Sequence, residues 1–214
     1  MDIALLDFDG TLSRGDSILP YLLYCMRQGA APREQLFRAG GAFLRQKMRQ
    51  DSLVRVKEVS LSFLRGMTEE EAAGLARGFW REQVRKRVYP EAAEALQQLR
   101  QRGLMAVVVS ASPDCYMRLL PEFLPADAVI ATHCEVSEGR YTGRVEANCK
   151  GENKVKRVRE WLKQEGLEEA RIAEAYGDSL SDLPMLMMAI HPILINPSKS
   201  LREALPQAKM ERWH

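Results

Sequence analysis

The chain of 214 residues lacks the features that build zinc sites, disulfide scaffolds and membrane spans. Its three histidines and four cysteines include no Cys-x-x-Cys pair and no zinc-ligand spacing. The longest apolar stretch, residues 18–26, is about half the length that crosses a bilayer. No basic segment followed by a long apolar run marks a signal peptide at the N-terminus. We therefore expect a cytoplasmic protein without a membrane partner.

The four cysteines are expected to be reduced thiols. Cys134 and Cys149 flank a predicted hairpin and could face each other, but disulfides are rare in cytosolic proteins. The net charge is only +2, so the charge of the whole chain gives no reason to expect a nucleic-acid partner. With 46% hydrophobic and 28% charged residues, the composition is that of an ordinary globular protein with one main core.

Helical patterning without a convincing strand fills the region that follows the first strand and its loop at residues 1–12. A capping box, Thr-x-x-Glu at residues 68–71, opens the last helical segment of this region. The predicted helical segments are 17–27, 33–49, 52–64 and the one that begins at Thr68. We interpret residues 13–87, called the cap below, as an inserted helical domain.

From Pro90 onward, helices and strands alternate. The predicted helices are 90–102, one from Tyr116, 153–165 and 183–188, and the predicted strands are 105–109, 129–132, 171–176 and a last one at 192–195. Residues 134–145 alternate around Glu138-Gly139 as a hairpin does. This alternation predicts the α/β class, with a parallel sheet covered by helices on both faces.

Chemically useful side chains follow the predicted core strands. Asp7 and Asp9 follow the first strand, Ser110 follows residues 105–109, and Asp178 follows residues 171–176. Lys154 begins the helix before that last strand. Because active sites of such sheets lie beyond the carboxyl ends of the strands, four distant segments are expected to share one cleft.

These segments resemble, in order, the four motifs of the haloacid dehalogenase-like (HAD) hydrolase superfamily, in its phosphoserine-phosphatase-like branch. The motifs are Asp7-Phe8-Asp9-Gly10-Thr11, Ser110 after an apolar strand, a helix-starting lysine, and Gly177-Asp178-x-x-x-Asp182. The resemblance covers nearly the whole chain. It implies a three-layer Rossmann-like core of residues 1–12 and 88–214, with residues 13–87 as a helical C1 cap that opens and closes over the site.

The resemblance also implies a role for each motif. Asp7 is the expected nucleophile, which forms an aspartyl-phosphate. Asp9 is expected to protonate the leaving alkoxide and then to deprotonate the water that hydrolyses the intermediate. Ser110 is expected to donate a hydrogen bond to a phosphoryl oxygen, and Lys154 to offset the clustered negative charge. The expected direct ligands of Mg²⁺ are Asp7, the carbonyl of Asp9 and Asp178. Asp182 is expected to contact the metal through water or to support its ligands. The residues expected beside the substrate are Thr11, Asp16, Ala111 and Lys150.

Structural interpretations stand beside these roles. Asp7 and Asp9 could be turn residues, and Ser110 and Asp182 could be helix caps. Asp16, similarly, could cap the helix that begins at Ser17. Lys150 competes with Lys154 for the catalytic position, but the spacing from Lys154 to Asp178 fits the family better.

The sequence leaves the substrate open. Where phosphoserine phosphatases usually carry Ser-Gly-Gly, this chain has Ser110-Ala111-Ser112, and Ser181 replaces an asparagine. No counterpart of their carboxylate-binding cap arginine appears near residues 59–62. The cap holds 15 Lys or Arg against 8 Asp or Glu, which could attract anionic substrates or be a set of solvated helix faces.

The leading functional hypothesis is a magnesium-dependent phosphatase acting on a small phosphorylated metabolite, as a monomer or weak homodimer. The alternatives are a phosphotransferase or phosphomutase, which passes the phosphoryl group to another acceptor, and a non-catalytic binding module. Dehalogenation is disfavoured because it requires neither Asp9 nor an acidic fourth motif.

Overall fold

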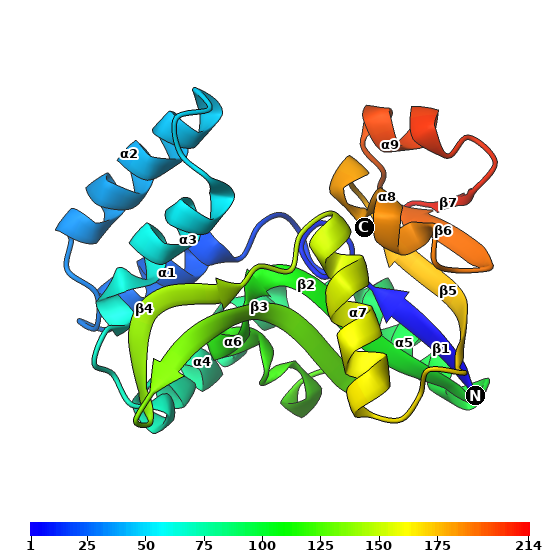
Figure 1. The fold of residues 1–214 in the computed structure, drawn as a ribbon, viewed down its shortest axis with the longest axis horizontal. Helices are drawn as coiled ribbons and strands as arrows, with labels where there is room; N and C mark the ends of the chain where they lie inside the picture. The colour runs from blue at the N-terminus through cyan, green and yellow to red at the C-terminus, as the bar shows by residue number, and fades with distance from the viewer.

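A seven-stranded sheet forms the centre of the computed structural model, which describes residues 1–214 (Figure 1). The strand order is β4-β3-β2-β1-β5-β6-β7, and every neighbouring pair is parallel except β3 and β4. The strands are β1 (Asp2–Leu6), β2 (Leu104–Pro113), β3 (Ala128–Ser137), β4 (Arg140–Ala147), β5 (Arg171–Gly177), β6 (His191–Ile195) and β7 (Lys209–Glu211).

Helices cover both faces of this sheet, as the alternation predicts; Figure 1 shows α7 in front and α5 behind. In β1, Ile3 and Leu5 join the apolar cluster that contains α7, whereas Ala4 and Leu6 join the cluster that contains α5. The core helices are α5 (Pro90–Gln101), α6 (Asp114–Met117), α7 (Glu152–Gln164), α8 (Leu183–Leu186) and α9 (Lys199–Ala204). The three-layer α/β core is therefore confirmed.

Helices alone fill the chain between β1 and α5. These are α1 (Ile18–Arg27), α2 (Glu34–Lys47), α3 (Leu53–Leu61) and α4 (Glu69–Glu82). The predicted capping box begins α4: the backbone N–H of Glu71 donates to Thr68 Oγ1 at 3.2 Å, and that of Thr68 donates to Glu71 Oε2 at 2.8 Å. Two short 3₁₀ turns, Ser62–Leu64 and Val84–Lys86, lie in the same region, and two more, Leu120–Glu122 and Leu180–Asp182, lie in the core.

The cap and the core share one apolar cluster. Trp80 of α4 lies 5.6 Å from Phe8 and 5.2 Å from Phe123, measured between ring centroids. Its indole N–H donates to the carbonyl of Tyr116 at 2.8 Å. Because every buried apolar side chain of the cap except Ala42 belongs to this same cluster, the cap has no separate hydrophobic core.

Several predicted elements need correction. The helix expected from Tyr116 is the four-residue α6, since Pro121, which lacks a backbone N–H, falls in the 3₁₀ turn that follows. One strand, β3, contains both the predicted strand 129–132 and the first arm of the hairpin. Residues 192–195 are not the last strand, because α9 and β7 follow. β7 is a three-residue edge strand, too short to show a period in the sequence.

All four cysteines are free and buried. Cys134 and Cys149 belong to different apolar clusters, so the pairing left open by the sequence does not occur. No helix has both the length and the apolar character that a membrane span requires.

Candidate active site

The loop after β1 brings the first motif against the fourth. The backbone N–H of Asp7 donates to the carbonyl of Tyr176 at 2.9 Å, which extends the pairing of β1 with β5. Gly10 has φ +93°, and a Cβ at this position would lie 2.5 Å from Asp178 Oδ2. Glycine is therefore required here both for the backbone angle and for the approach of Asp178.

Lys154 lies buried between two carboxylates. Its ammonium donates to Asp7 Oδ1 at 2.5 Å and to Asp182 Oδ1 at 2.7 Å, and the side chain is 1% exposed. Lys150 is half-buried and makes neither contact. Of the two candidate lysines, Lys154 is the one beside the carboxylates.

Both oxygens of Asp182 are occupied by protein donors. Oδ2 accepts hydrogen bonds from the backbone N–H of Ser179 at 3.1 Å and from its hydroxyl at 2.7 Å, while Oδ1 accepts from Lys154. Asp182 thus caps the 3₁₀ turn at Leu180–Asp182 and also holds the lysine. The side chain does not cap the helix at Leu183, as the structural interpretation had it, but it does hold Lys154 as expected.

The carboxylate of Asp9 is held by a chain of buried hydroxyls. Ser112 Oγ donates to Asp9 Oδ2, and Ser17 Oγ lies 2.9 Å from both Ser112 Oγ and the hydroxyl of Tyr116. The second oxygen, Asp9 Oδ1, is buried without a hydrogen-bond partner. Asp9 therefore has one anchored oxygen and one available for chemistry.

The second motif lies under the cap. Ser110 is fully buried, and its hydroxyl accepts from the backbone N–H of Ser112 at 3.0 Å. It does not cap a helix, since α6 begins at Asp114. The carbonyl of Ala111 accepts hydrogen bonds from Lys57 Nζ at 2.6 Å and from Thr132 Oγ1 at 2.7 Å.

The remaining predicted contacts lie nearby. Thr11 Oγ1 is 3.2 Å from Asp7 Oδ2 and 3.1 Å from Asp178 Oδ1, so it is within hydrogen-bond distance of both carboxylates. Asp16 is exposed, and its Oδ1 accepts from the backbone N–H of Ile18 at 2.9 Å at the start of α1. The capping interpretation of Asp16 is therefore confirmed.

Lys57 is a residue that the sequence interpretation missed. Its ammonium reaches from α3 to the carbonyl of Ala111, to Thr132 Oγ1 at 3.0 Å and to Asn148 Oδ1 at 2.5 Å. A signal was present, because Lys57 lies four residues after Leu53 and four before Leu61, on the apolar stripe of its helix. A lysine in that position indicates a buried cation with partners on a neighbouring element.

Burial of Lys57 predicts a pH-dependent stability. Burial, reinforced by Lys150, lowers the pKa of Lys57 from 10.5 to about 8. Between these values the unfolded chain binds more protons than the folded one, so this group makes stability rise with pH. We expect the stability of the wild type relative to Lys57→Met to increase from pH 8 to pH 10.5, as measured by urea unfolding. A pH-independent difference would contradict this prediction.

The site carries an excess of negative charge. Asp7, Asp178 and Asp182 converge there, and Lys154 is the one cation that forms ion pairs within this group. Burial, opposed by Lys154, raises the pKa of Asp7, and burial together with Asp182 raises the pKa of Asp178 to about 6. Burial would lower the pKa of Lys154, but the Asp7 and Asp182 carboxylates outweigh it and raise the pKa. Lys154 therefore stays protonated.

These residues fit a divalent cation with hard oxygen ligands. Carboxylate oxygens of Asp7, Asp178 and Asp182 lie within 4.8 Å of one another. Those of Asp182 are already occupied, and no backbone N–H donates to the carbonyl of Asp9. Asp7 Oδ1 pairs with Lys154 and Oδ2 lies beside Thr11, but each oxygen keeps a further lone pair. Asp7, Asp178 and the Asp9 carbonyl could therefore hold Mg²⁺, and such a cation would offset the surplus charge.

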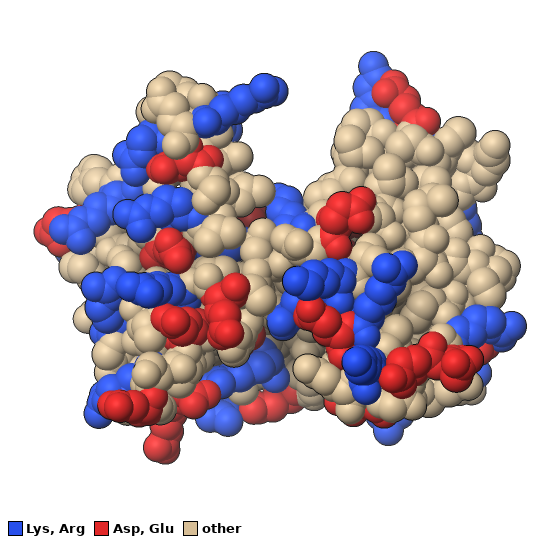
Figure 2. Space-filling model, viewed as in Figure 1, with Lys and Arg blue, Asp and Glu red and all other residues tan.

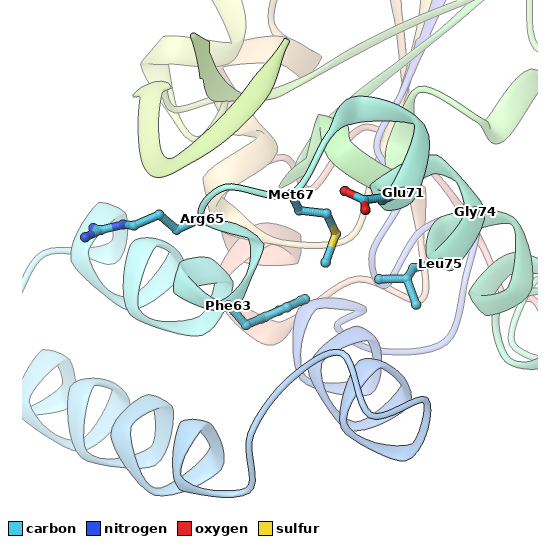
Figure 3. A pocket seen from close by; sticks show the side chains of 6 residues that line it. All are labelled: Phe63, Arg65, Met67, Glu71, Gly74 and Leu75. Carbon is cyan, nitrogen blue, oxygen red and sulfur yellow. The ribbon is translucent and has the colours of Figure 1, made fainter. Parts of the chain in front are cut away.

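A separate pocket of about 540 Å³ lies within the cap, away from these residues. Figure 3 shows Phe63, Met67 and Leu75 around it, with Arg65 pointing away. Glu71 and Gly74 complete its lining, and Glu71 is already engaged by Thr68. None of the clustered carboxylates lines this pocket.

Comparisons with known proteins agree with this geometry. The sequence profile described as haloacid dehalogenase-like hydrolase matches residues 4–187. A probable phosphatase of Mycobacterium tuberculosis is 29% identical over 98% of this chain and 73% of its own length. A protein of unknown function from Bordetella pertussis has a crystal structure that matches with TM-score 0.90 and 28% identity, covering 98% of this chain and 97% of that one.

The structure titled a phospho-aspartyl intermediate analogue of phosphoserine phosphatase shares the fold, with TM-score 0.62 and 22% identity. The match covers 97% of this chain and 91% of that one. The family profile covers most of the chain, including Asp7, Ser110, Lys154 and Asp178. The chain therefore belongs to the haloacid dehalogenase-like hydrolases and is an enzyme of that family with a phosphoserine-phosphatase-like fold.

Proposed function

We propose that the protein is a magnesium-dependent phosphatase that hydrolyses a small phosphate monoester through a phosphoryl group carried on Asp7. The observation that carries this proposal is the contact of Lys154 with Asp7 beside Asp178 and Asp9. Phosphoryl transfer depends on positioning and on stabilisation of charge, and this cluster offers a carboxylate nucleophile, a cation and a set of oxygen ligands.

Asp7 is the proposed nucleophile because its carboxylate is oriented on one side by Lys154 and on the other by Thr11. Magnesium, when bound by Asp7, Asp178 and the Asp9 carbonyl, would stabilise charge on the phosphoryl oxygens. Ser110 lies within the neighbouring β2, two residues beyond Val108, where the pairing with β1 ends before Asp7; this position supports its proposed contact with the phosphoryl group.

Asp9 is the proposed acid and base. Burial, with the nearby Asp16 carboxylate, raises the pKa of Asp9 to about 7, so both protonation states are accessible near neutral pH. Protonated Asp9 would give its proton to the leaving alkoxide, and ionised Asp9 would then take one from the water that attacks the phosphorylated Asp7. Oδ1, the oxygen without a partner, is available for both transfers.

Ser112→Ala tests whether the hydroxyl chain positions this acid. We expect turnover of an alkyl phosphate to fall about tenfold. This loss is smaller than the full contribution of a general acid, because the variant misplaces Asp9 without removing it. Turnover of p-nitrophenyl phosphate should change little, because nitrophenolate leaves without a proton. The matched control is Ser13→Ala, a buried serine whose hydroxyl contacts only the carbonyl of Phe8. An equal loss on both esters would mean that Ser112 does not act on protonation of the leaving group by Asp9, because hydrolysis of phosphorylated Asp7 is common to both esters.

The assay that tests the proposed function measures phosphate release from a panel of phosphate monoesters that includes phosphoserine. It is run with Mg²⁺ and with a chelator. Hydrolysis of a few esters, lost with the chelator, is the expected result. Absence of release from every ester by folded, magnesium-binding protein would overturn the proposal. Transfer of phosphate to an added alcohol in preference to water would favour a phosphotransferase.

A further inference from the structure

Helix α2 exposes its largest apolar side chains and buries small or polar ones. Phe37 is 80% exposed, Leu44 58% and Met48, just after the helix, 52%. At about 100° per residue, these three positions fall within an arc of about 40° on one side of the helix. The buried positions of α2, on the opposite side, are Gln35, Ala39 and Ala42. This pattern is the reverse of a helix that only packs against its own core.

The packing of α2 explains its buried side but not its exposed one. Gln35 Nε2 donates to Ser62 Oγ at 2.9 Å and to the carbonyl of Val59, which fastens α2 to the end of α3. Figure 1 shows α3 between α2 and the sheet. The stripe of Phe37, Leu44 and Met48, called the α2 stripe below, therefore lies on the side of α2 opposite the one fastened to α3.

Cations flank the α2 stripe. Residues 33–49 contain five Lys or Arg and a single acid, Glu34. Arg38 and Lys47 are exposed, and Lys47 Nζ lies 5.1 Å from the ring centroid of Phe43. In Figure 2, blue Lys and Arg atoms project around tan atoms on the upper left lobe, where α2 lies, with some red atoms below them. Arg45 is paired with Asp51 at 2.8 Å.

We propose that the α2 stripe is a contact surface for anionic lipid bilayers. A convex helix face with apolar residues in the middle and cations at the sides fits the boundary between lipid headgroups and acyl chains. Arg and Lys side chains can place their charges at headgroup phosphates while the apolar residues insert. A second copy of the chain fits less well, because pairing two such faces would bring like charges together.

This surface goes beyond the proposed phosphatase activity and does not depend on it. No membrane partner is expected from the sequence because no segment is long enough to span a bilayer, whereas the proposed contact is peripheral. The attraction between the cations beside the α2 stripe and anionic headgroups should weaken with salt, since exposed charges are screened over about 8 Å at physiological ionic strength.

The test is sedimentation of the full-length protein with vesicles of phosphatidylcholine, alone or in equal mixture with phosphatidylglycerol. We expect the wild type to bind the anionic vesicles at low salt and much less the neutral ones. Phe37→Ser/Leu44→Ser and, separately, Arg38→Glu/Lys47→Glu should each reduce the bound fraction at least about fivefold. The matched control is Met187→Ser/Ile190→Ser, which alters two exposed apolar residues outside the cap; their exposed fractions are 65% and 54%.

Three results would overturn the proposal. The first is no sedimentation of the wild type with anionic vesicles at low salt. The second is an equal loss of binding in the Met187→Ser/Ile190→Ser control. The third is a concentration-dependent dimer that Phe37→Ser/Leu44→Ser abolishes, which would assign the α2 stripe to a second copy. Phosphate release, measured in parallel on a soluble ester, reports separately on the proposed function.

Discussion

Asp7→Asn is expected to abolish phosphate release, with a loss of at least about 10⁴-fold in kcat. The amide cannot attack phosphorus as the carboxylate does, and it is a poorer ligand for Mg²⁺. The measurement is phosphate release at saturating Mg²⁺ with the best ester of the panel. The fold should persist, because Asp182 still pairs with Lys154 and one of the clustered carboxylates becomes neutral.

The matched control for this variant is Asp2→Asn, on the same strand. Asp2 pairs with Arg171 at the opposite end of β1, and its loss should leave turnover unchanged. An Asp7→Asn variant that is folded and retains more than a few per cent of the wild-type rate would remove Asp7 as the nucleophile.

Lys154→Met is expected to destabilise the protein by about 3–5 kcal/mol, because it leaves the Asp7 and Asp182 carboxylates buried without their cation. This loss is a large fraction of the stability of an ordinary domain. Urea unfolding at neutral pH measures it. The control is Lys156→Met on the same helix, since Lys156 is 74% exposed and its pair with Glu160 spans 3.8 Å. That change should cost less than about 0.5 kcal/mol.

A double variant identifies the cause of the Lys154→Met loss. If unpaired buried charge is responsible, Lys154→Met/Asp182→Asn should be more stable than Lys154→Met alone. If Lys154 contributes only through the packing of its stem, the second substitution should add a further loss. A loss of less than about 1 kcal/mol for Lys154→Met would contradict the buried ion pair itself.

The elements predicted correctly are those whose signal is local. The continuous apolar run of β1, the β-branched run of β2 and the amphipathic pattern of α7 are each displayed within a single segment. The capping box at Thr68 is likewise complete within four residues. The motif residues could be placed in one site because parallel strands end at a common edge.

Contacts between distant segments carry no such local signal. Lys57 donates to the carbonyl of Ala111, which is 54 residues away in the sequence. Ser17 contacts Ser112, which is 95 residues away. Nor does the sequence show which face of α2 meets α3, since its apolar residues are its exposed ones. The three-residue β7 exists only because β6 offers it an edge.

The sequence by itself determined the α/β core, the inserted helices and the identity of the motif residues, because periodicity and motifs are written within short segments. Spacing along the chain already favoured Lys154 over Lys150, and Lys154 is the lysine that contacts Asp7; the tertiary structure alone decided that Asp9 has one anchored oxygen. The physical reason is that a buried charge selects its partner by desolvation and distance in three dimensions, which spacing along the chain does not encode.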